Sequence, residues 1–402
     1  MITLQRNCPV CGYSKGEILH HQEYLVPDEL QSPPDVDIVS CLRCGLGFAD
    51  LRTQQDVLDD EYRDHSKYAD TSLYADDPAQ QNRPPTDAPW DLERLAGTAA
   101  WLAGHLPPNA RVLDSGCATG ALLGFLKDVG FTNLVGLDPS PTATATATRL
   151  YGVPTVTGSF LDPPADIGAF DLVVLSHVLE HLADVEGAVQ GMWTLTGPGG
   201  LVYIEVPDAA RYAEFLVAPF HDFNTEHINH FSAATLELAM ARAGFETIHI
   251  GTKDVLCSPT DPYPALFGLF RHGANQVQSL VIERDVQLVA SLRSYVHQSS
   301  QLMASMDSHI LAAAAENSLV VWGAGQLAMK LLSGVLSGCT VSAIVDTSAS
   351  KWGQHFGDMQ VVGPTHVPDD SSPILITSIH HQASIRSSIA EQFPGRQVIE
   401  LR

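Results

Sequence analysis

Basic residues are scarce in this sequence of 402 residues. It holds 22 lysines and arginines against 46 aspartates and glutamates, so its formal net charge is −24 at pH 7. A protein that binds nucleic acid or an anionic membrane surface gathers positive charge on one face. The composition therefore argues against both kinds of partner, although a phosphorylated small molecule can still bind at a local site.

Long apolar runs are also missing. No stretch of about 18 apolar residues occurs, so no membrane-spanning helix is predicted. Only seven residues precede Cys8, too few for a secretory signal peptide, and we therefore expect a cytoplasmic protein. In that compartment the seven cysteines indicate metal ligands or free thiols rather than disulfides.

Four cysteines form two closely spaced pairs. Cys8 and Cys11 make one C-x-x-C, Cys41 and Cys44 make the other, and a glycine follows each pair. Two such turns can complete a tetrahedral zinc site, and four thiolates leave no position for a substrate, which predicts a structural zinc. The alternative is free thiols or a redox pair.

The middle of the chain alternates predicted helices and strands. A helical pattern over 92–106 ends at two prolines, and predicted strands lie at 111–113, 133–137, 170–175 and 200–206. This alternation is typical of a doubly wound parallel sheet, whose ligands lie at the carboxyl ends of the strands.

A glycine turn follows the first of these strands, in the sequence V-L-D-S-G-C-A-T-G from Val112 to Gly120. It is not the dinucleotide motif G-x-G-x-x-G, because the acid precedes the glycines and the spacing differs. Such a turn lets a ligand approach the backbone and leaves N–H groups at a helix start.

Other residues expected at this edge of the sheet complete a predicted nucleoside site. Asp138 ends the next strand about 20 residues later, where a carboxylate can accept both hydroxyls of a ribose, and Phe160 is a candidate to stack on the base. The predicted cofactor-binding residues are Asp114, Gly116, Gly120, Asp138, Pro139, Ser159, Phe160, Ser176 and His177.

Two histidine-rich segments could carry chemistry. His177 to His181 matches H-x-x-E-H, a zinc-protease pattern, but it directly follows a buried strand, which favours a place beside the cofactor. The loop 221–232 offers three histidines and an acid; His227 is the candidate general base, with Glu226 in support. The alternative is a loop held only by its own hydrogen bonds.

The two connecting regions and the last domain are less specific. Tyr62, Tyr68 and Tyr74 recur every six residues, a spacing that suits neither a helix stripe nor a strand face, so packing and substrate contact both stay open. Residues 276–315 predict one or two amphipathic helices between domains. A strand at 318–322, a turn at Gly323 to Gly325 and a strand ending at Asp346 predict a Rossmann-like half, with or without a ligand.

The order of these parts resembles the sugar C-methyltransferases that act on nucleotide-linked keto-deoxysugars. The resemblance rests on the four cysteines, D-S-G-C-A-T-G, V-L-E-H-L, E-H-I-N-H-F-S and the C-terminal W-G-A-G. It implies an α/β protein with a zinc-binding module over 1–85, a class I methyltransferase (Rossmann-like) domain over 86–255 that binds S-adenosylmethionine (SAM), and a helical linker with a C-terminal Rossmann-like α/β domain over 256–402.

The resemblance also implies roles for residues. His227 would be the base, Glu226 the acid beside it, and the nucleotide of the substrate would lie between the central and C-terminal domains. The chain departs from the family at Asn224, where a tyrosine is usual, and lacks the proline near Tyr62 and Tyr68. An O- or N-methyltransferase of another natural product, or a SAM-binding scaffold without activity, are the alternatives.

Overall fold

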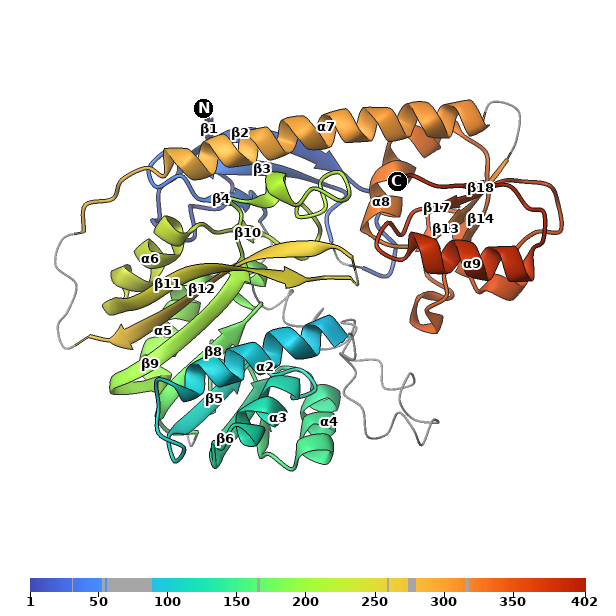
Figure 1. Ribbon diagram of the computed structural model, residues 1–402. Coiled ribbons are helices and arrows are strands. Elements are labelled where there is room, and N and C mark those ends of the chain that lie inside the picture. Colours follow the sequence, from blue (N-terminus) through green and yellow to red (C-terminus); the bar gives the residue numbers. More distant parts are fainter. Residues whose placement is uncertain are drawn as a thin grey trace.

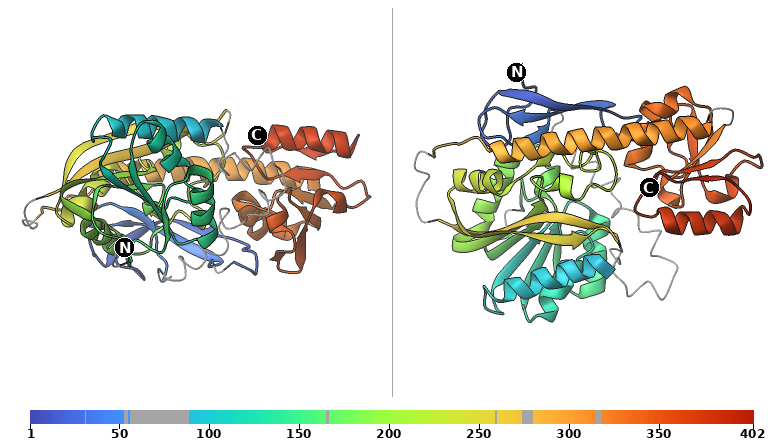
Figure 2. Two further views of the ribbon diagram at one scale, coloured as in Figure 1. Left: turned by 90° about the horizontal axis from the view of Figure 1, so that it is seen from below. Right: turned by 45° about the horizontal axis from the view of Figure 1, so that its top comes forward.

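The computed structural model describes residues 1–30, 32–52, 55, 89–164, 167–258, 260–273, 280–314 and 318–402. Tyr62, Tyr68 and Tyr74, and the expected boundary at residue 85, lie outside this part of the chain. The described residues form three sheets; Figures 1 and 2 show the C-terminal sheet to one side of the other two, with one long helix running from the N-terminal sheet to the C-terminal domain. No helix in the described part is long and apolar enough to cross a membrane.

The first sheet has five strands in the order β1-β2-β3-β4-β10. Its members are β1 (Ile2–Thr3), β2 (Lys15–Glu23), β3 (Asp35–Cys41), β4 (Gly47–Ala49) and β10 (Asn229–His230). The last strand comes from the histidine-rich loop of the central domain, and it pairs antiparallel with β4. The N-terminal module therefore includes a segment that the sequence assigns elsewhere.

The central sheet has seven strands in the order β11-β12-β9-β8-β5-β6-β7. Its members are β5 (Arg111–Ser115), β6 (Asn133–Asp138), β7 (Thr155–Thr157), β8 (Phe170–Ser176), β9 (Thr196–Pro207), β11 (Phe245–Leu256) and β12 (Pro262–His272). The neighbours β5 to β9 pair in parallel, whereas β12 pairs antiparallel with both β9 and β11. This topology confirms the predicted class I methyltransferase fold.

The central sheet extends beyond residue 255, where we expected the domain to end. β12 lies between β9 and β11, so Pro262–His272 belongs to the central domain. Pro262 and Pro264 lie in the first residues of β12, but the pairing of β12 with β9 begins only at Ala265. Proline is tolerated there because no donor to that neighbour is needed before this point.

Helices cover both faces of the central sheet (Figure 1). They are α2 (Pro89–Ala103), α3 (Ala121–Asp128), α4 (Pro141–Tyr151), α5 (Val185–Leu195) and α6 (Ala233–Arg242), with short 3-10 turns at η2 (Leu179–His181) and η3 (Tyr212–Glu214). Ser140 caps α4 and Ser232 caps α6 through their side chains, as expected for serine before a helix.

The segment expected to hold one or two helices forms a single one, α7 (Val286–Ala314). It runs from the N-terminal sheet to the C-terminal domain along one side of the molecule (Figures 1 and 2). Leu288, Leu292 and Ile310 on its buried face share a hydrophobic cluster with residues of both end domains. The helix thus joins the domains through apolar packing.

The C-terminal sheet has the order β15-β16-β14-β13-β17-β18. Its strands are β13 (Leu319–Trp322), β14 (Val341–Val345), β15 (His355–Phe356), β16 (Met359–Val362), β17 (Ile374–Ile376) and β18 (Val398–Ile399). Its helices are α8 (Gln326–Ser333) and α9 (Gln382–Gln392), with 3-10 turns η4 (Val335–Gly338), η5 (Ala349–Lys351) and η6 (Pro364–His366). The predicted Rossmann-like pattern is confirmed.

Candidate active site

The glycine turn after β5 is shaped by packing. Gly116 and Gly120 have φ of +75° and +85°, and a Cβ on Gly116 would lie 2.5 Å from Cγ2 of Val178. The N–H of Gly116 donates to the carbonyl of Leu137 at the end of β6. Glycine is needed here because side chains rarely adopt this conformation and no space is left for one.

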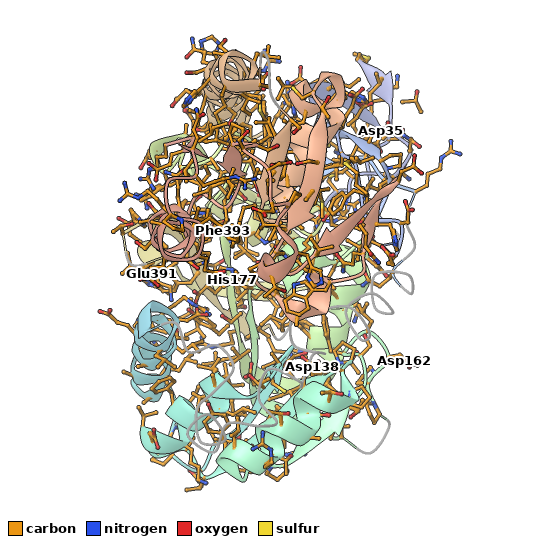
Figure 3. All side chains as sticks on the ribbon, turned by 90° about the vertical axis from the view of Figure 1, so that its right-hand side faces the viewer. Asp35, Asp138, Asp162, His177, Glu391 and Phe393 are labelled. Atoms are coloured by element: carbon orange, nitrogen blue, oxygen red, sulfur yellow. The ribbon has the colours of Figure 1, made fainter. Side chains whose placement is uncertain are left out.

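Asp138 holds the turn in place. Its Oδ2 accepts the N–H of Ala118 at 2.8 Å and its Oδ1 accepts the N–H of Ser140 at 2.9 Å. Burial raises its pKa, and these two N–H groups oppose that rise. Each carboxylate oxygen keeps a further lone pair, so hydrogen bonds to two ribose hydroxyls remain feasible. Figure 3 shows Asp138 and His177 near the middle of the view, below the C-terminal elements.

The other predicted cofactor residues surround this point with different degrees of exposure. Asp114 is buried, and burial together with the charge of Asp138 raises its pKa to about 7. Phe160 belongs to the central hydrophobic core, and Ser159 accepts the N–H of Leu161 through its hydroxyl. Pro139 is half-buried beside Asp138. Their contact with a cofactor remains a prediction.

The segment after β8 is fixed by a buried ionic network. The Oγ of Ser176 accepts a hydrogen bond from Arg94, which also pairs with Glu205. His177 has a φ of +54°, and its ring contacts Glu180 at 3.1 Å and Glu205 at 3.4 Å. Burial disfavours the charged ring, but these two carboxylates outweigh it and raise the pKa of His177.

The H-x-x-E-H pattern does not form the arrangement of a zinc protease. It occupies a strand end and a 3-10 turn, so the two histidines do not share one face of an α-helix. The ring of His177 lies beside Glu205 in the ionic network, whereas Nδ1–H of His181 donates to the carbonyl of Glu226, 3.0 Å away. Pairing of the two histidines on one metal is therefore not supported.

The loop 221–232 folds directly onto this segment. The N–H of Ile228 donates to the carbonyl of Glu180, and the amide of Asn229 donates to the carbonyl of Leu182. These contacts bring His227 beside His181, with ring centroids 4.9 Å apart. Ligand atoms of Glu180, His181 and His227 lie within 4.8 Å of one another.

The surroundings of His227 disfavour its charged form. Burial, followed by the charges of neighbouring histidines, lowers its pKa well below 6.5. Its Nδ1 is buried and has no hydrogen-bond partner among the described residues. Glu226, which we expected to support it, has an exposed side chain, and the acid that the structure groups with His227 is the buried Glu180. The sequence signal for Glu180 was the H-x-x-E-H pattern itself.

Asn224 shapes the loop from within. Its Oδ1 accepts the N–H groups of both Glu226 and His227, and its amide donates to the carbonyl of His221. An asparagine side chain that bonds the backbone two and three residues on is a common turn device. The side chain of Asn224 therefore holds the backbone at Glu226 and His227 in place.

The four cysteines form a compact buried cluster. The Sγ atoms of Cys8 and Cys44, and those of Cys11 and Cys41, lie 3.5 Å apart, and all four are within 4.8 Å. Tetrahedral zinc with Zn–S bonds of about 2.3 Å separates its sulfur atoms by about 3.8 Å. The donor set and spacing therefore fit a structural zinc ion.

Comparison with known proteins identifies the central domain. The model of a methyltransferase domain family matches residues 90–250, so the chain contains a SAM-dependent methyltransferase domain. A probable S-adenosylmethionine-dependent methyltransferase of Mycolicibacterium smegmatis is 29% identical over 143 residues, covering 35% of this chain and 54% of that protein.

Two further proteins are similar. C-methyltransferase NovU of Streptomyces niveus is 26% identical over 228 residues, covering 55% of this chain and 49% of NovU. The chain thus spans about half the length of these curated relatives. Magnesium protoporphyrin IX methyltransferase (ChlM) of Synechocystis PCC 6803 aligns with a TM-score of 0.41 at 15% identity, covering 55% of this chain and 99% of that chain.

Proposed function

We propose that this protein transfers a methyl group from SAM to a carbon atom of a nucleotide-linked keto-deoxysugar. The observation that carries the proposal is the partly buried His227, whose pKa is lowered well below 6.5 and which is grouped with Glu180 and His181 beside the carboxyl end of β8. The similarity to a protein named as a C-methyltransferase supports transfer to carbon.

The residues of the central domain fit SAM. Asp138 would accept the ribose hydroxyls, and the turn from Gly116 to Gly120 would receive the rest of the cofactor. When bound, SAM supplies an electrophilic methyl group.

His227 would remove a proton from the carbon next to the ketone. The C–H electron pair then spreads onto the ketone oxygen, and the proton goes to a ring nitrogen of His227. The carbon would form its new bond to the methyl group as the methyl–sulfur bond breaks; the electron pair of that bond stays on sulfur, and neutral S-adenosylhomocysteine leaves. A buried carboxylate at Glu180 favours the imidazolium that forms, because opposite charges attract strongly where water is excluded. A positioned base contributes about 100- to 10,000-fold to the rate.

The nucleotide of the substrate would lie between the central and C-terminal domains. Thr225 exchanges two hydrogen bonds with Gln326 of α8, and the ring of His221 lies 5.0 Å from that of His380. The Nε2 of His380 is buried and has no partner among the described residues. Donors from both domains therefore border the loop that carries His227.

The test separates proton removal from methyl transfer. A nucleotide-linked 4-keto-6-deoxysugar is incubated in D₂O without SAM, and deuterium uptake at the carbon next to the ketone is followed by NMR. We expect His227→Asn to slow uptake by about 100-fold or more while the Kd for SAM stays nearly unchanged. His297→Asn, on the exposed face of α7, is the matched control and should exchange like the unaltered protein.

Other outcomes would decide against the proposal. Equal deuterium uptake in His227→Asn and the unaltered protein would remove His227 as the base. A labelled methyl group found on oxygen would favour O-methyl transfer, the activity named for the ubiquinone biosynthesis O-methyltransferase of Rhizobium etli, which is 35% identical over 101 residues, 23% of this chain and 40% of that protein.

A further inference from the structure

The C-terminal domain contains a cavity of about 390 Å³. All its lining residues fall between Trp322 and Ser388, and they come from the ends of β13 and β14, the segment after β17 and the helix α9. Neither His221 nor His380 of the interdomain region lines it. Its volume lies within the range of about 300–1,000 Å³ that is usual for small-molecule sites.

The position of the cavity is that of a ligand site in an open α/β sheet. β13 pairs with β14 on one side and with β17 on the other, and both pairings are parallel. The chain therefore reverses its direction of winding at β13, and the crevice at the carboxyl end of such a strand receives ligands in this fold class. Glu391 and Phe393, labelled in Figure 3, mark the far end of α9.

The hydrogen bonds between an aspartate and the backbone at this crevice are the same as those at the predicted cofactor site. In the central domain Asp138 accepts the N–H groups of Ala118 and Ser140, at 2.8 and 2.9 Å. In the C-terminal domain Asp346 accepts the N–H groups of Ala324 and Ser348, both at 2.8 Å.

The glycine at the start of the turn makes the same backbone hydrogen bond in both domains. Gly116 donates its N–H to the residue before Asp138, and Gly323 donates its N–H to Val345, the residue before Asp346. Gly323 has a φ of +114°, and a Cβ there would lie 2.8 Å from the hydroxyl oxygen of Thr377. Both domains therefore present a carboxylate from the second strand to the glycine turn after the first.

Charged and polar groups line the cavity around Asp346. Lys351 pairs with its Oδ2 at 3.1 Å. Trp322 is 1% exposed, and its indole N–H has no acceptor among the described residues. Ser384 and Ser388 add hydroxyls one turn apart on α9. Because buried donors are normally hydrogen-bonded, an unpaired buried donor beside a cavity indicates that a ligand in the cavity supplies the acceptor.

We propose that this cavity binds a ribonucleoside or ribonucleotide through the vicinal hydroxyls of its ribose, separately from the methyltransferase site. Asp346 accepts the two hydroxyls in the way that Asp138 is placed to do in the central domain. The indole of Trp322 donates to an oxygen of the ligand. Lys351 swings from Asp346 to the ligand or to solvent when the hydroxyls take its place.

The binding is measured by calorimetry on the full chain, with the methyltransferase site saturated by S-adenosylhomocysteine. The probes are adenosine and uridine 5′-monophosphates and their 2′-deoxy counterparts. We expect at least one ribonucleotide to bind once per chain, and its 2′-deoxy counterpart to bind at least about tenfold more weakly, because a carboxylate left without its hydroxyl loses a charged hydrogen bond. This comparison requires no substitution.

Two variants test the site itself. Asp346→Asn should weaken ribonucleotide binding at least about tenfold, and Trp322→Phe should weaken it without removing a charge. Asp138→Asn is the matched control: it should lower the affinity for S-adenosylhomocysteine but leave ribonucleotide binding unchanged. The proposal is overturned if neither ribonucleotide binds at millimolar concentration, if the 2′-deoxy forms bind equally well, or if Asp138→Asn abolishes the binding instead of Asp346→Asn.

Discussion

The guanidinium of Arg6 donates a hydrogen bond of 2.6 Å to Oδ1 of Asn229, 223 residues further along the chain. Arg6 lies two residues before the first cysteine of the four-cysteine cluster, and Asn229 lies two residues after His227. The amide of Asn229 in turn donates to the carbonyl of Leu182, next to His181. One contact therefore links the N-terminal module to the proposed base and its neighbours.

Replacement of Arg6 should destabilise the protein through Asn229. In Arg6→Met, Oδ1 of Asn229 loses its donor in a buried site, which costs about 1–3 kcal/mol of unfolding free energy. A double-mutant cycle with Asn229→Leu, followed by urea unfolding, isolates the pair because the second change removes the orphaned acceptor. Strictly additive effects of the two substitutions would contradict the coupling.

Removal of the metal should lower turnover more than cofactor affinity. Purified protein should contain about one zinc atom per chain, and chelation or Cys44→Ser should loosen the pairing of β4 with β10 next to His227. Methyl transfer and the Kd for SAM are measured on the same sample. Cys339→Ser, outside the cluster, is the control; equal turnover with and without metal would separate the module from the site.

Alanine at Gly116 should be more damaging than alanine at Gly130. Both glycines have positive φ, at +75° and +109°, but a Cβ at Gly130 meets nothing within 4 Å, whereas one at Gly116 meets Val178. We expect Gly116→Ala to lose about 1–3 kcal/mol more than Gly130→Ala, as overpacked positions do. Val178→Ala should recover part of that difference in thermal unfolding, and no recovery would rule out the clash as the cause.

Lys330 should make stability rise with pH. Burial lowers the pKa of Lys330 from 10.5 to about 7, against the charge of Asp222. Between about pH 7.5 and 10 the unfolded chain holds one proton more at this lysine than the folded chain does. The contribution of the neutral Lys330 amine to the free energy of unfolding is thus complete above the unfolded pKa. It is lost as pH falls toward 7, at about 1.4 kcal/mol per pH unit.

The variant Lys330→Met removes this titration. The free energies of unfolding of the two proteins are measured with urea at several pH values from 7 to 10. As pH rises, the free energy of unfolding of the unaltered protein should increase relative to that of Lys330→Met. A difference that stays constant across this range would show that Lys330 keeps its proton in the folded state.

Much of the local structure was predictable from short stretches of sequence. The strand ending at Asp138 and the strand 341–345 were expected within one residue of their observed bounds, because a buried apolar run and a following acid or glycine are local signals. The paired C-x-x-C turns likewise predicted the cluster that the structure forms. The boundary expected at residue 255 left out β12, because only the pairing of strands shows that Pro262–His272 lies between β9 and β11.

The sequence by itself determined the class of the central domain, the cysteine cluster and the presence of histidines in one loop. Only the tertiary structure decided that Glu180, rather than Glu226, accompanies His227, that β10 completes the N-terminal sheet, and that Asp346 repeats the position of Asp138. The reason is physical: turn chemistry and periodicity act over a few residues, whereas strand pairing and burial of a carboxylate depend on segments that are far apart in the chain and meet only when the domains pack.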